Sequence, residues 1–151
     1  MPDGKLVFVP GGYELIHSAT TEEEVKTFAV GGNLDKYGLL HVYAKVPELE
    51  TEYYLAMSFS ETQSFNWNYQ FNQSTVAREY PYYIRADVKM ENDQAFIEAG
   101  HATRYQSNTK MGSACVISSH RFKYVVLTSN TNDILLPIGT HLEVWGIRKG
   151  E

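Results

Sequence analysis

The chain has 151 residues, of which 43% are hydrophobic and 21% charged, and its 13 basic and 18 acidic side chains leave a formal net charge of -5. This length suits one domain with its own core, and the composition excludes a disordered or collagen-like chain. Nucleic-acid binding is not expected, because phosphate backbones are bound by clustered Lys and Arg, which an acidic chain of this composition lacks.

The sequence shows neither a membrane-spanning segment nor a secretory signal, and it cannot form an internal disulfide bond. No apolar run approaches about 18 residues, so membrane insertion is not expected. The first residues do not combine a basic segment with an apolar one, so we expect no secretory signal. The single cysteine, Cys115, has no partner for an internal disulfide bond. Synthesis in the cytosol is therefore expected.

Short segments of alternating polarity follow one another along the chain, separated by turns rich in Gly, Pro, Asn and Asp. The clearest occupies residues 80–90, where even positions are apolar and odd positions include Arg85, Asp87 and Lys89. Because successive side chains of a strand point to opposite faces, one face of this segment belongs in a core. Further strands are expected at residues 5–9, 13–19, 25–30, 37–46, 53–59, 65–71, 95–101, 114–118, 121–129 and 141–148. Residues 20–26 are expected to form a turn that leads into a strand.

About ten short strands without a substantial helix predict an all-β fold, either an antiparallel β-sandwich or a closed barrel. No internal repeat, low-complexity segment or linker divides the chain, so residues 1–151 are expected to form a single domain.

Several expected strands are apolar on both faces, although the outer face of a two-sheet sandwich should be wet. Self-association is the simplest cover for such a face, and the alternative is that single apolar side chains are merely exposed. The candidates for an oligomer interface are Leu39, Tyr43, Val125, Leu127, Trp145 and Ile147.

The sequence contains no motif of an activated nucleophile, a phosphate-binding loop or a metal site. Cys115 lies in an apolar run that is typical of an inert core thiol. His141 and Glu143 share a strand face, where a salt link is a better interpretation than one side of a metal site. We therefore expect no catalytic residue, no metal ion and no cofactor, and a hydrolase with a cryptic site is kept as an alternative.

Aromatic residues make up 13% of the chain, and in residues 65–71 four rings alternate with three amides. Rings offer flat apolar faces and amides offer donors and acceptors, which is what a sugar needs for stacking and for its hydroxyl groups. The alternative is that the rings form core and the amides face water. The glycan-binding candidates are Trp67, Asn66, Asn68, Gln70, Tyr54 and Tyr83.

Residues 136–150, LPIGTHLEVWGIRKG, resemble the closing strand of jelly-roll domains in bacteriophage and prophage structural proteins. Residues 13–16 and 25–30 are similar to the opening strands of those domains. The resemblance implies a jelly-roll-like β-sandwich that belongs to a virion, as a trimeric tip or fibre domain or as an accessory protein of the head, neck, baseplate or tail. It also implies that such a domain sometimes binds a receptor glycan.

These observations together predict a non-enzymatic structural protein of a bacteriophage virion. We expect a homo-oligomer, most simply a homotrimer, that contacts other virion proteins and a host cell-surface glycan. The alternatives are a carbohydrate-binding module from a cellular polysaccharide-degrading system and a hydrolase with a cryptic site.

Overall fold

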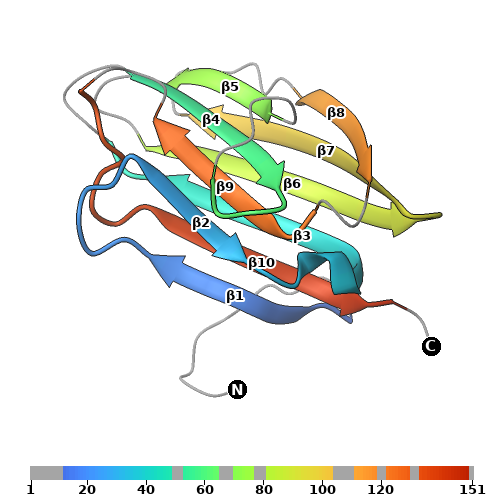
Figure 1. Cartoon of the computed structure of the whole chain (residues 1–151). Coiled ribbons are helices and arrows are strands. Elements are labelled where there is room, and N and C mark those ends of the chain that lie inside the picture. Colours follow the sequence, from blue (N-terminus) through green and yellow to red (C-terminus); the bar gives the residue numbers. More distant parts are fainter. Residues whose placement is uncertain are drawn as a thin grey trace.

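The computed structural model describes residues 12–48, 53–64, 70–76, 81–103, 111–118, 122–129 and 133–149, which form two antiparallel sheets packed face to face (Figure 1). The larger sheet has the order β1 (Glu14–Thr20), β10 (His141–Arg148), β3 (Tyr37–Val46), β6 (Tyr82–Glu91), β7 (Gln94–Thr103) and β8 (Met111–Ser118). The smaller sheet has the order β2 (Thr27–Gly31), β9 (Tyr124–Ser129), β4 (Tyr53–Ser60) and β5 (Gln70–Val76). The prediction of an all-β antiparallel sandwich is confirmed.

The strand pairs are nested in one another. β1 pairs with β10, β2 with β9, β3 with β6, and β4 with β5, while β7 and β8 extend the larger sheet beyond β6. The chain therefore runs like one long antiparallel ribbon rolled into a sandwich. As a result the first described strand, in blue, lies beside the last one, in red (Figure 1).

Most expected strands occur close to their expected bounds, and β3 matches its bounds at both ends. Residues 21–26 form a turn as expected, with an isolated bridge between Val25 and Leu136. Of the segment expected at residues 65–71, only Gln70 and Phe71 are described, and they belong to β5. Residues 5–9 and 65–69 lie outside the described residues. A short 3-10 turn at Leu34–Lys36 was not expected from the sequence.

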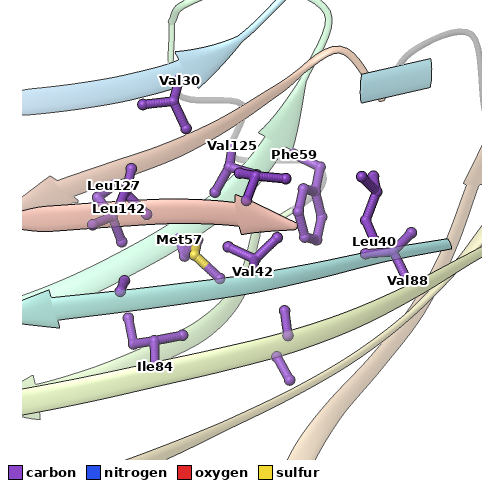
Figure 2. Packing of buried hydrophobic residues seen from close by; sticks show 14 of the residues in the cluster. Val30, Leu40, Val42, Met57, Phe59, Ile84, Val88, Val125, Leu127 and Leu142 are labelled. Atoms are coloured by element: carbon purple, nitrogen blue, oxygen red, sulfur yellow. The ribbon is translucent and has the colours of Figure 1, made fainter. Parts of the chain in front are cut away.

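The core lies between the two sheets and consists of alternate residues of the central strands (Figure 2). In β3 and β6 every second side chain is buried, as the period-two pattern requires. The rings of Phe59 and Phe122 meet at a centroid distance of 4.0 Å. Further fully buried side chains include Leu40, Val42, Ala44, Leu55, Met57, Leu142 and Val144.

Val125 and Leu127 were expected in an oligomer interface, and this prediction is wrong. Both side chains are fully buried in the core of the single chain. Val126, which alternates with them, is fully buried too. β9 lies between β2 and β4, and both of its faces are covered within one subunit. A strand that is apolar on both faces therefore does not reveal whether its cover comes from its own chain or from another copy.

A cluster of hydrogen bonds ties the turn before β10 to the end of β1. The hydroxyl groups of Thr140 and Thr21 donate to the carbonyl of Pro137 at 2.7 and 3.0 Å. The backbone N–H of Thr140 donates to the hydroxyl of Thr21 at 3.0 Å. These bonds fix where β10 begins, and they place His141 opposite Thr20 on the neighbouring strand.

Gly146 in β10 is a site where a single added carbon should lower the free energy of unfolding. A Cβ at Gly146 would overlap with the side chain of Ile16 and lie 3.0 Å from side-chain atoms of Leu40 and Tyr37. We expect Gly146→Ala to cost about 1–3 kcal/mol, measured by urea unfolding, because overpacking forces neighbours to move. Gly38→Ala on the adjacent strand is the control, because there an added Cβ would make only ordinary contacts of 3.4 Å or more. An equal loss in both variants would contradict this account of the packing.

Candidate functional site: the outer face of the six-stranded sheet

The outer face is the surface of the six-stranded sheet that points away from the four-stranded sheet. It is built by the side chains that alternate with the buried ones, and these are half-buried or exposed. The residues that form it on β1, β10, β3, β6 and β7 are Leu15, Ser18, Thr20, His141, Glu143, Trp145, Ile147, Leu39, His41, Tyr43, Lys45, Tyr83, Arg85, Asp87, Lys89, Phe96 and Glu98. Four of the six predicted interface residues therefore share one face: Leu39, Tyr43, Trp145 and Ile147.

One end of the outer face is apolar. Leu15 is the direct neighbour of Trp145, and Ile147 is the direct neighbour of Leu39. Phe96 lies further along the row of Ile147 and Leu39, where Lys89 of β6 stands between Leu39 and Phe96, and Leu15 and Phe96 are 48% and 40% exposed. These five residues are called the apolar band below. Such a patch on one sheet face is typical of a surface that contacts a partner.

A chain of hydrogen bonds connects Thr20, His141, Glu143 and Trp145. The Nε2–H of His141 donates to Oε1 of Glu143 at 2.9 Å, since a carboxylate can only accept. The Nδ1 atom of the same ring lies at hydrogen-bond distance, 2.7 Å, from the hydroxyl of Thr20. The indole N–H of Trp145 donates to Oε2 of Glu143 at 3.2 Å. Both oxygens of Glu143 are thus engaged, and the indole edge is held in place.

The order hydroxyl, imidazole and carboxylate in this chain is also the order of a catalytic triad. Acyl transfer needs two further things, which are donors directed at an oxyanion and a site that excludes water. Thr20 is exposed on the edge strand β1, on an open sheet face. In this setting the hydrogen bonds hold Glu143 and Trp145 in a defined arrangement.

A second histidine–carboxylate pair crosses from β3 to β6. The Nδ1–H of His41 donates to Oδ1 of Asp87 at 2.8 Å, and the two residues are direct partners in the strand register. Nothing in the sequence pointed to this pair, because its members are close only through the pairing of the two strands. Its largely exposed carboxylate makes it worth little to stability.

The other end of the outer face carries two tyrosines and a lysine. The rings of Tyr43 and Tyr83 lie 6.3 Å apart at an angle of 34°. The ammonium group of Lys45 lies 5.8 Å from the centre of the Tyr83 ring. Burial raises the pKa of the Tyr43 phenol, and the charges of Tyr83 and Glu143 raise it further. Tyr43 therefore keeps its proton at neutral pH and can donate a hydrogen bond. Tyr43 and Tyr83 are called the tyrosine pair below.

The predicted glycan-binding residues do not gather at one place in the described structure. Tyr83 lies on the outer face, whereas Tyr54 and Gln70 belong to β4 and β5 of the other sheet, and the structure describes only the backbone of these two residues. Trp67, Asn66 and Asn68 lie outside the described residues. The contact between the rings of Tyr43 and Tyr83 could not be predicted from the sequence, because it depends on the pairing of β3 with β6.

The described residues contain neither a group of metal-binding side chains nor a membrane-spanning helix. Among them, no group of three or more His, Cys, Asp or Glu side chains is placed to hold a metal ion. Within the same ranges, no helix is long and apolar enough to cross a membrane.

Comparison with protein-family models, curated proteins and solved structures gives no significant match for this chain. The function is therefore inferred from the geometry of the outer face and from the sequence.

The Tyr43 phenol should make stability depend on pH in the alkaline range. Since its pKa is raised in the folded state, its contribution is complete below about pH 10 and is lost as the pH rises through the folded-state pKa. We expect Tyr43→Phe to lose less stability than the wild type between about pH 8 and pH 11, compared by urea unfolding at both pH values. Identical pH dependence in the two proteins would show that this phenol is not perturbed by the fold.

Proposed function

We propose that the protein is a non-enzymatic structural module of a bacteriophage virion that self-associates through the outer face of the six-stranded sheet and contacts a glycan on the host surface. The observation that carries the proposal is the apolar band. It covers the neighbouring strands β1, β10 and β3 and continues at Phe96 of β7 beyond Lys89 of β6, on a sheet face that is expected to be polar. It includes two side chains that are more than one third exposed.

Covering the apolar band with another copy removes apolar surface from water at about 25 cal/mol per Å². A closed symmetric assembly needs one complementary patch on each subunit, and the outer face offers such a patch on every copy. A trimer is the assembly that the resemblance to phage tip and fibre domains implies.

Two of the four sheet edges, those formed by β1 and β2, favour association through the face over association through the strands. The edge strand β1 has a register shift between Leu15 and His17. A bulge of this kind twists an edge and breaks the row of backbone groups that a further strand would pair with. The edge strand β2 is only five residues long. Side-chain contacts across the outer face are the better route to an oligomer.

Two further features support the assignment to a virion. The nested strand pairing agrees with a jelly roll, an architecture found in viral capsid and lectin domains. The segment that resembles phage domains, residues 136–150, includes the tightly bonded turn at residues 137–140 and the strand β10. This segment contributes to both the core and the outer face.

A carbohydrate-binding module of a cellular polysaccharide-degrading system is the second candidate. The tyrosine pair favours it, because half-buried rings on a sheet face form a platform for sugar rings. Such a module would act as a single subunit, so the oligomeric state separates the two candidates.

The proposed interface is tested by placing a charge in the apolar band. Leu15→Arg and Phe96→Arg should each weaken self-association by tenfold or more, since an unpaired charge in an apolar contact costs about 1.4 kcal/mol or more. Light scattering after size exclusion, over a range of concentrations, measures the mass of the assembly. Both side chains are exposed, so the fold should tolerate the changes.

Ile138→Arg is the matched control for these variants. Ile138 is 60% exposed but lies in the turn before β10 and outside the apolar band. The substitution Ile138→Arg should leave the mass of the assembly unchanged. A monomeric wild type, or an equal effect of all three substitutions, would refute self-association through this face.

A further inference from the structure

We propose that Tyr43, Tyr83 and Lys45 form a binding site for a carboxylated sugar of the uronic or sialic acid class. The site lies at the end of the outer face opposite the apolar band. The inference rests on the proposed function, since it names the chemistry of the glycan that the module would contact.

The strand register brings the three side chains together from two neighbouring strands. Lys45 is the direct partner of Tyr83, and Tyr43 lies two residues before Lys45 on the same face of β3. Ile147 and Leu39 of the apolar band belong to the opposite end of the same strands. Self-association through the band and sugar binding at the tyrosine pair can therefore use one sheet face without competing for the same side chains.

The two rings provide the stacking surface and the hydrogen-bond donor that a sugar needs. They are tilted by 34° to each other, and both are half-buried, so their positions are defined before a ligand arrives. A sugar ring has an apolar C–H face that packs on an aromatic ring. The phenol of Tyr43, which stays protonated at neutral pH, can donate to a sugar oxygen.

The charges at this end favour a carboxylate over a neutral sugar. Glu143 is the acid nearest to Tyr43 along the register, and both of its oxygens already accept hydrogen bonds. Among the described residues, no carboxylate lies within ion-pair distance of the Lys45 ammonium, which faces the ring of Tyr83. A ligand carboxylate would supply the partner that Lys45 lacks.

Lys89 provides a matched control on the same face. It also projects outward from the six-stranded sheet, but its ammonium pairs with Glu91 at 3.2 Å, and its direct partners in the register are Leu39 and Phe96 of the apolar band and not a tyrosine pair. Lys45→Met and Lys89→Met remove the same charge and nearly the same volume from the two ends of the outer face.

The test is a calorimetric titration of the full chain with two ligand pairs. Sialyllactose and trigalacturonic acid are each compared with their own methyl ester, so that within each pair the charge of the carboxylate is the main difference. We expect at least one acid to bind about tenfold more tightly than its uncharged counterpart. Lys45→Met and Tyr83→Ala should lower that affinity by about tenfold, whereas Lys89→Met should keep it.

Four results would overturn the site: no binding of either acid, equal affinity for the uncharged counterparts, an equal loss in both lysine variants, or full affinity in Lys45→Met. Circular dichroism of each variant shows whether Tyr83→Ala has kept the fold, and Lys45→Met, at an exposed position, decides the question if it has not. Light scattering on the same samples separates this inference from the proposed function. An oligomer without sugar binding refutes only the site, and a monomer that binds the acids refutes only self-association.

Discussion

The antiparallel pairing of β3 with β10 is the constraint on which the rest of the structure depends. Its register sets Val42 beside Val144 on the inner face and Tyr43 beside Glu143 on the outer face. Because side chains alternate along a strand, a slip of one residue would exchange the two faces completely. The burial of the inner residues therefore also fixes which side chains are presented outward. In this fold the residues buried in the core determine which side chains of the same strands form the outer face.

The sequence was sufficient to predict features that depend on local alternation. The period-two pattern gives the all-β class and the bounds of β3, and it identifies the outward positions of Leu39 and Trp145. It could not predict that Val125 and Leu127 are covered within their own chain, because burial of both faces of β9 depends on distant segments. The same holds for the side-chain network, since Thr20 and His141 are 121 residues apart in the sequence.

The outer face combines two kinds of chemistry that are seldom found on a solvated sheet. At one end, moving large apolar side chains out of contact with water would lower the free energy of an assembly. At the other end, the tyrosine pair and Lys45 combine flat rings with an ammonium group. Two histidine–carboxylate pairs on the same face, His41–Asp87 and His141–Glu143, hold polar groups in fixed places. In the proposed function, this division lets one sheet face hold copies together at the apolar band and leaves the tyrosine pair and Lys45 open to a ligand.

The most direct test of the central claim is radical footprinting of exposed side chains at low and at high protein concentration. The account predicts that Leu15, Phe96 and Trp145 become protected as the concentration rises, while Ile138, in a turn away from this face, is labelled equally throughout. Labelling of the apolar band that does not change with concentration, or protection confined to the four-stranded sheet, would contradict it.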